Sequence, residues 1–448
     1  MNLRPAWKTV CALAWALAPM ASAGSPARQP NFIIIFMDDA GYADVGCFGA
    51  KTFKTPRIDS LATDGMRLTS FYAQAVCGPS RGALMTGRYP VRVGGGWTTN
   101  DDEITVAEVL KGAGYATCCI GKWDMSKRSN QEGMMPNDQG FDHYFGTLGA
   151  NDKGSVTFYR DREKLNSTSD MGSLTKLYTD EAIQFLERQK KEKPFFLYLA
   201  HTMMHVMIDA SPQFKGKSSG DLYGDAMEEV DWNTGRLLDS VHDLGFGDNT
   251  FILFTSDNGP WNSKEEEFKK SHGGHLATGS ALPLRSGKNT AYEGGFRVPA
   301  ILRGPGVPVG QSRDGILSTL DVLPTFAALA SNKAPQDREI DGFDQSAYLT
   351  GKSPASARDY FFYHLGKEAK AVRWNEWKLW FNSSAKGGEA LFTATELYNL
   401  KDDIGESRNV AADHPEIVKR LLTLAQNAPR MNKSEEAATK KKKNKESQ

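Results

Sequence analysis

The stretch from Cys77 to Arg88 carries the residue types best suited to chemistry in this 448-residue chain. Pro79 suits the first turn of a helix, where a missing backbone N–H is tolerated, and Gly87 suits the helix exit. Cys77 is therefore expected at a helix N-terminus, where free N–H groups and the helix dipole favour an anion. Arg81 adds a positive charge one turn later. An isolated cysteine is most often a small buried hydrophobe, but these surroundings favour a reactive one.

Two clusters of oxygen donors could hold a hard metal ion. Asp38 and Asp39 follow one apolar, β-branched run, and Asp257 and Asn258 follow another. Because no Cys or His stands beside the carboxylates, the donor types favour Ca²⁺ or Mg²⁺ over zinc. A single Asp after a strand more often caps a helix or a turn. The metal interpretation therefore depends on the two clusters coming together.

Apolar runs that end in polar residues organise the first three quarters of the chain. The expected strands are Asn31–Met37 before Asp38, Tyr115–Ile120 before Lys122, Phe195–Ala200 before His201 and His205, and Thr250–Thr255 before Asp257. Amphipathic helices are expected at 57–66, 103–111, 174–191 and 223–244, and at 317–329 with a break at Pro324. This alternation predicts an α/β fold with a doubly wound, mostly parallel sheet flanked by helices. Ligands bind at the carboxyl ends of strands in such sheets, so the four polar clusters should converge in one cleft.

Composition divides the chain into four parts. Residues 1–23 have the basic start, short apolar run and small-residue cleavage site of a signal peptide, so we expect export to the periplasm or secretion. Residues 24–345 form the expected catalytic α/β domain. Residues 346–430 have short antiparallel strands and a helix near 414–426, which predict a smaller C-terminal α+β subdomain with a short antiparallel sheet. Residues 431–448 form a charged tail of a kind that is usually disordered.

The overall charge and the cysteine count limit the partners. Lys plus Arg and Asp plus Glu both total 54, so no global basic field favours nucleic acid, and anion recognition must be local. The N-terminal apolar run is too short to span a membrane, and no later run replaces it. Four of the five cysteines follow the signal segment, which is too few for a disulfide scaffold. Cys118 and Cys119 are expected to be buried thiols.

The motifs resemble those of the type I, formylglycine-dependent sulfatases of the alkaline phosphatase-like superfamily. Cys-x-Pro-Ser-Arg followed by Thr-Gly, at 77–87, is similar to the family's signature. Residues 38–49 and 255–260 are similar to its metal motifs, 121–123 and 286–295 to its sulfate-binding motifs, and 200–205 to its histidine motif. The likeness covers nearly the whole mature chain, with the motifs in family order.

The resemblance implies a sulfuric ester hydrolase. A maturation enzyme would oxidise Cys77 to formylglycine, and one hydroxyl of the hydrated aldehyde would attack sulfur. The implied roles are ligation of Ca²⁺, with Mg²⁺ as the alternative, by Asp38, Asp39, Cys77, Asp257 and Asn258, sulfate neutralisation by Arg81, Lys122 and Lys288, and leaving-group protonation by His205. The choice of His205 over His201 rests on the resemblance alone.

Three positions depart from the family pattern. Asp124 stands where the family usually has His, Met204 and Met207 stand where prolines usually flank the second histidine, and Met85 replaces Leu. A carboxylate at 124 would repel sulfate unless it pairs with a lysine or the metal, or binds a substrate hydroxyl.

We expect the substrate to be an O-sulfate ester, and we favour a carbohydrate over another alcohol as the group that carries the sulfate. Candidates to line a sugar site are residues 97–101, Trp261, residues 272–275, Trp374 and Trp377. Two alternatives stay open. One is a phosphatase or phosphonate hydrolase of the same superfamily, against which Cys77 and the oxygen ligands argue. The other is a catalytically silent protein that binds sulfated polymers, which Asp124 and the basic tail suggest.

Overall fold

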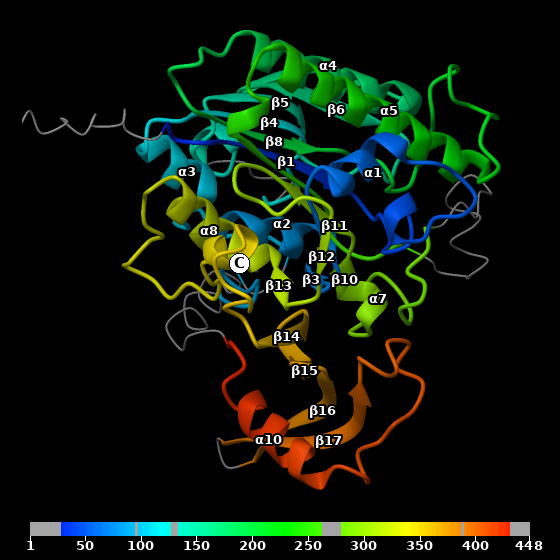
Figure 1. The fold of residues 1–448 in the computed structure, drawn as a ribbon, viewed down its shortest axis with the longest axis vertical. Helices are drawn as coiled ribbons and strands as arrows, with labels where there is room; N and C mark the ends of the chain where they lie inside the picture. The colour runs from blue at the N-terminus through cyan, green and yellow to red at the C-terminus, as the bar shows by residue number, and fades with distance from the viewer. Residues whose placement is uncertain (1–27, 95–96, 127–132, 262–278, 387–388, 431–448) are drawn as a thin grey trace, which may run out of the picture.

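A ten-stranded sheet forms the centre of the molecule, in the order β12-β2-β11-β9-β1-β8-β4-β5-β6-β7 (Figure 1). The computed structural model describes residues 28–94, 97–126, 133–261, 279–386 and 389–430. The expected signal peptide and the charged tail lie outside these residues. Within the described chain, no helix has both the length and the apolar character needed to cross a bilayer.

Five neighbouring strands of this sheet run parallel, and their ends define one edge. They are β9 (Thr250–Ser256), β1 (Asn31–Met37), β8 (Phe195–Ala200), β4 (Ala116–Lys122) and β5 (His143–Thr147). Every residue of β1 is buried, because side chains on both faces of the sheet meet a hydrophobic core. The doubly covered, mostly parallel sheet confirms the predicted fold class.

Further strands extend both sides of this parallel core. On one side are β11 (Ala300–Arg303), antiparallel to β9, then β2 (Met66–Leu68) and β12 (Gln311–Arg313). On the other side are β6 (Val156–Arg160) and β7 (Glu163–Thr168), which pair antiparallel. The sequence did not predict β5, β6 or β7, because none of them is a continuous apolar run.

Helices cover both faces of the sheet. One face carries α1 (Pro56–Thr63), α4 (Leu174–Glu187) and α5 (Asp221–Asp243), and the other carries α2 (Cys77–Thr86), α3 (Val106–Gly112) and α8 (Val322–Leu329) (Figure 1). The expectation of a helix over 317–329 with a break at Pro324 is wrong in its start and in the break. Leu317–Ser318 forms strand β13, and Pro324 lies in the first turn of α8, where it does not interrupt the helix.

A smaller antiparallel sheet forms the C-terminal part of the chain. It contains β14 (Tyr360–Leu365), β15 (Glu368–Trp374), β16 (Trp377–Lys386) and β17 (Glu389–Asn399), and α10 (Pro415–Ala425) packs on it. Figure 1 shows a three-stranded sheet between the two larger ones. That sheet joins β10 (Arg297–Val298), β3 (Phe71–Tyr72) and β13, near the short helices α7 (Glu293–Phe296) and α9 (Ser346–Leu349).

A buried ionic network connects the two parts of the molecule. Lys378 Nζ of β16 lies 3.0 Å from Glu293 Oε1 of α7 and 2.8 Å from Glu406 Oε1, and all three side chains are fully buried. Tyr72 and Tyr363 each donate a 2.6 Å hydrogen bond to the Glu293 carboxylate. Burial alone would raise the pKa of Glu293, but Lys378 and two nearby arginines outweigh it and lower that pKa to about 2.

We expect Lys378→Met to lower the free energy of unfolding by about 3–5 kcal/mol, because it leaves two buried carboxylates without their shared cation. The matched control is Lys370→Met, which removes a more exposed pair with Glu368 and should change stability by about 1 kcal/mol or less. Urea unfolding measures both. Equal losses in the two variants would contradict the assigned role of the network.

Candidate active site

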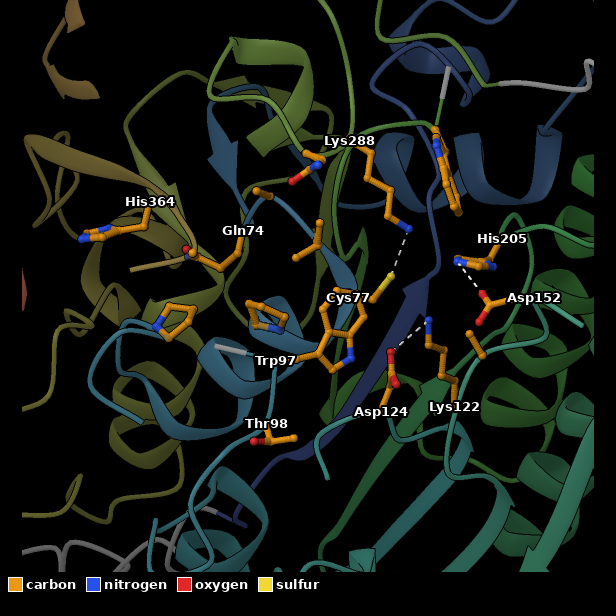
Figure 2. Close-up of a pocket in the computed structure, with 18 of the residues that line it drawn as sticks. Gln74, Cys77, Trp97, Thr98, Lys122, Asp124, Asp152, His205, Lys288 and His364 are labelled. Carbon is orange, nitrogen blue, oxygen red and sulfur yellow. Dashed lines mark hydrogen bonds and ion pairs between the residues drawn. The ribbon is translucent and has the colours of Figure 1, made fainter. Parts of the chain in front are cut away.

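The polar residues that follow β9, β1, β8 and β4 surround Cys77, the first residue of α2. A cavity of about 960 Å³ opens above them, and Cys77, Lys122, His205 and Lys288 are among its lining residues (Figure 2). Asp38, Asp39, Arg81, Asp257 and Asn258 are buried and contact those lining residues directly or through one another. The structure thus brings all nine sequence-predicted site residues together.

The start of α2 fixes Cys77 at the cavity floor. Val76 is extended, Cys77 begins the helix, and Gly87 ends it in the left-handed region at φ 67°. Cys77 Sγ lies 3.2 Å from Lys288 Nζ and 3.9 Å from Asp39 Oδ1. Burial raises the pKa of the Cys77 thiol well above its ordinary value. The predicted position of Cys77 at a helix N-terminus is confirmed, and its activation stays a prediction.

Three buried carboxylates lie beneath Cys77, and each has a cationic partner. Asp38 Oδ2 lies 2.7 Å from Lys122 Nζ, and Asp39 Oδ1 lies 2.6 Å from Lys288 Nζ. Burial alone would raise the pKa of Asp38, but Lys122 and the other cations outweigh it and hold that pKa well below its usual range. For Asp257, burial and the neighbouring Asp38 charge raise the pKa to about 7.

Arg81 lies under the cavity and links three elements. Its guanidinium donates to Asp257 Oδ2 at 2.7 Å, to the carbonyl of Lys122 at 3.0 Å and to the hydroxyl of Tyr198 at 3.3 Å. Its side chain is fully buried. Arg81 therefore holds α2 against the ends of β4, β8 and β9, and its charge reaches the cavity from below.

The carboxylates and Asn258 fit a hard metal ion. One ligand atom each from Asp38, Asp39, Cys77 and Asp257 lies within 4.8 Å of the others. Asp38 Oδ1, Asp39 Oδ2 and Asn258 Oδ1 are buried and lack a hydrogen-bond partner among the described residues. Asp39 has φ 61°, an uncommon conformation for a non-glycine residue that turns the chain sharply after β1. Oxygen donors of this kind suit Ca²⁺ or Mg²⁺.

His205 reaches the cavity and His201 does not. His205 Nε2 lies 3.3 Å from Asp152 Oδ1 and 3.8 Å from Asp39 Oδ2, while Nδ1 lies 2.6 Å from the carbonyl of Val206. Burial lowers the pKa of His205, and the charges of Asp39 and Asp38 oppose this shift. His201 is buried away from the cavity, and burial lowers its pKa to about 4. The structure therefore distinguishes His205, which lines the cavity, from His201, which does not; the sequence alone could not make this choice.

The remaining candidates divide between the cavity wall and the C-terminal sheet. Trp97 and Trp261 line the cavity, and the Trp261 ring lies 4.8 Å from Lys288 Nζ and 5.6 Å from the His205 ring. Trp374 instead packs under Arg420, and Trp377 packs against His414, in the C-terminal subdomain. Residues 272–275 lie outside the described residues. Cys118 and Cys119 are buried free thiols, as predicted.

Sequence reasoning missed several residues that line the cavity. Asp152 follows β5, which was not predicted, and Gln74 and His364 lie in no recognised motif. Asn289 lies in the 286–295 motif but was not singled out as a site residue. His364 comes from β14, so the C-terminal sheet contributes to the cavity wall. The Asn-Asp pair at 151–152 after an alternating segment was the only local signal for Asp152.

Comparisons with known proteins establish the family. The sulfatase family model matches residues 30–332. N-acetylgalactosamine-6-sulfatase of Sus scrofa is 36% identical over 401 residues, which cover 81% of this chain and 74% of that protein. Arylsulfatase A of Homo sapiens is 34% identical over 466 residues, which cover 91% and 89%. A solved structure from work on the metabolism of multiple glycosaminoglycans by Bacteroides thetaiotaomicron has a TM-score of 0.76 and 27% identity, over 89% of this chain and 98% of that one.

The chain therefore belongs to the sulfatase family and is a sulfuric ester hydrolase.

Proposed function

We propose that this sulfatase hydrolyses an O-sulfate ester of a carbohydrate, using formylglycine made from Cys77 and a Ca²⁺ ion. The observation that carries the proposal is the position of Cys77 at the cavity floor, with Lys288 Nζ 3.2 Å from its Sγ and the buried carboxylates beneath it. The name of the N-acetylgalactosamine-6-sulfatase relative supports a sugar substrate, and so do the two tryptophans in the cavity wall.

The proposal gives each residue of the site a role. The Sγ of Cys77 marks where the oxygens of the aldehyde hydrate would lie. When bound, Ca²⁺ supplies Lewis-acid polarisation of the sulfate and lowers the pKa of the hydrate. Asp38, Asp39, Asp257 and Asn258, together with modified Cys77, would hold that ion.

The remaining residues offset the negative charge of the sulfate and supply a proton to the leaving alcohol. Lys122 and Lys288 bind the sulfate oxygens, and Arg81 adds its charge from below, so that the negative charge spread over these oxygens is offset in the transition state. His205 Nε2 faces the cavity, and the protonated imidazolium would donate a proton from Nε2 to the leaving alcohol. A maturation enzyme that oxidises Cys77, and export to the periplasm or the medium directed by residues 1–23, belong to the same proposal.

We expect matured protein to release sulfate from 4-nitrophenyl sulfate and to act far more slowly on 4-nitrophenyl phosphate. Cys77→Ala removes the nucleophile and should lower kcat by about 10³–10⁶-fold. Cys47→Ala, which changes a partly buried thiol outside the cavity, is the matched control and should keep kcat within a few-fold. Faster hydrolysis of the phosphate ester would replace the proposal with a phosphatase.

We expect Ca²⁺ to stabilise chelator-treated protein, because it binds the folded carboxylate site and not the unfolded chain. At 100 times its dissociation constant, the ion contributes about 2.7 kcal/mol, which thermal unfolding detects as a rise in Tm. Asp39→Asn should abolish this rise, and Asp239→Asn, at an exposed carboxylate on α5, should leave it intact. A rise produced by Zn²⁺ but not by Ca²⁺ or Mg²⁺ would contradict the assignment of the metal.

A further inference from the structure

We infer that the sulfated unit is an uncharged sugar ring with a free hydroxyl near the sulfated carbon, and that Asp124 and Asp152 bind this ring's hydroxyls. The inference rests on the proposed function, and it names the substrate class for the same cavity.

The two carboxylates stand beside the two groups that would hold the sulfate ester. Asp124 follows β4, and its Oδ2 lies 3.4 Å from Lys122 Nζ. Asp152 follows β5, and its Oδ1 lies 3.3 Å from His205 Nε2. Both residues line the cavity, and Figure 2 shows their carboxylates facing Lys122 and His205. The side chain of Asp152 is 39% exposed, so it is accessible to a ligand.

Their positions relative to the ester decide which part of the substrate they meet. In the proposed reaction Lys122 contacts a terminal sulfate oxygen, and His205 contacts the oxygen that joins sulfur to carbon. Protein groups beside these two residues therefore face substituents on the ring carbons next to the sulfated carbon. Asp152 is therefore placed to meet a substituent next to the ester oxygen, and Asp124 one on the sulfate side of the ring.

The chemistry of a carboxylate selects those substituents. An ionised carboxylate only accepts hydrogen bonds, and its bonds from hydroxyl groups are short and strong. A second sulfate or a uronate carboxylate at the same place would face a like charge, which disfavours binding. A substrate ammonium group would instead lie close to Lys122. Uncharged donors, of which hydroxyls are the commonest on a sugar ring, meet neither repulsion.

Trp97 supplies an apolar surface for the same ring. Its side chain is 45% exposed and lies against the first turn of α2, where a Cβ at Gly78 would come within 2.9 Å of the indole Nε1. Figure 2 shows Trp97 on one side of Cys77 and His205 with Asp152 on the other. An aromatic wall with a few directed polar groups is the usual composition of a small-molecule site. It suits the apolar face and the hydroxyl edge of a neutral sugar.

The test measures kcat/KM of matured wild-type protein on methyl galactopyranosides sulfated singly at each hydroxyl, with 4-nitrophenyl sulfate as the reference substrate. The best monosulfate is then compared with three analogues in which the nearest hydroxyl is replaced by hydrogen, by a second sulfate or by an amino group. We expect the deoxy and disulfated analogues to lose at least about 100-fold, because the first lacks a hydrogen bond to a carboxylate and the second places two negative charges together. The amino analogue should also be slower than the hydroxyl compound.

Variants then assign the effect to the two carboxylates. Asp152→Asn and Asp124→Asn should each bring the hydroxyl-to-deoxy and monosulfate-to-disulfate ratios at least tenfold closer to one. Ratios within one enzyme cancel any change in its underlying activity. Asp239→Asn makes the same change of charge on the outer face of α5 and should keep the wild-type ratios.

Three results would overturn the inference. In the first, the protein hydrolyses 4-nitrophenyl sulfate, but its kcat/KM on the deoxy or disulfated analogue lies within about threefold of its kcat/KM on the parent sugar. This result would contradict the hydroxyl contacts and leave the proposed function intact. Preference for the amino analogue would make the bound group a cation. Failure to hydrolyse any substrate, including 4-nitrophenyl sulfate, would contradict the proposed function and the inference together.

Discussion

The buried carboxylates of Asp38, Asp39 and Asp257 impose the strongest physical constraint on this structure. Moving even one ionised carboxylate out of water is unfavourable by several kcal/mol unless an opposite charge compensates it. Here the compensating cations come from three separate segments: Arg81 from α2, Lys122 from the end of β4 and Lys288 from the loop before α7. The charge balance therefore connects elements that are far apart in the sequence.

The same ion pairs also hold positive charges at the cavity, where an anion can bind. Lys122 and Lys288 each contact a carboxylate on one side and line the cavity on the other. Their positive charges are therefore fixed in place before a substrate arrives, and need little rearrangement when negative charge develops on sulfate. Asp124 and Asp152 limit this preference, because they place negative charge beside the cations and favour ligands with hydroxyl groups next to the single sulfate.

The core strands and the convergence of their ends could be predicted from the sequence. β1 and β8 have the predicted bounds, and β9 extends only one residue further, because a strand buried on both faces needs an uninterrupted apolar run. Once these strands are parallel and adjacent, the polar residues after them must meet at one edge. That geometric rule, rather than any single residue, placed Asp38, Lys122, His205 and Asp257 together.

Other features could not be predicted, for identifiable physical reasons. β5 has polar and glycine positions in place of a continuous apolar run, and β7 is mostly exposed, so the extension of the sheet beyond β4 was missed. The loop after β5, which carries Asp152, was missed with it. The full burial of Cys77, and its effect on the pKa of the thiol, also could not be predicted from the sequence. A helix N-terminus favours a thiolate, but full burial raises the pKa of the thiol, and burial is a property of the tertiary structure. Lys288 was found through its motif alone, since no predicted strand precedes it.

The most direct test of the account is the mass of the tryptic peptide 68–81, isolated from active protein made in its own host. The account requires that Cys77 be converted, because the proposed nucleophile is a hydroxyl of the hydrated aldehyde. It predicts a mass that corresponds to replacement of the CH₂SH side chain by an aldehyde, or by its hydrate. An unmodified thiol in a preparation that hydrolyses sulfate esters would contradict the account, because the catalytic nucleophile would then have to be another group.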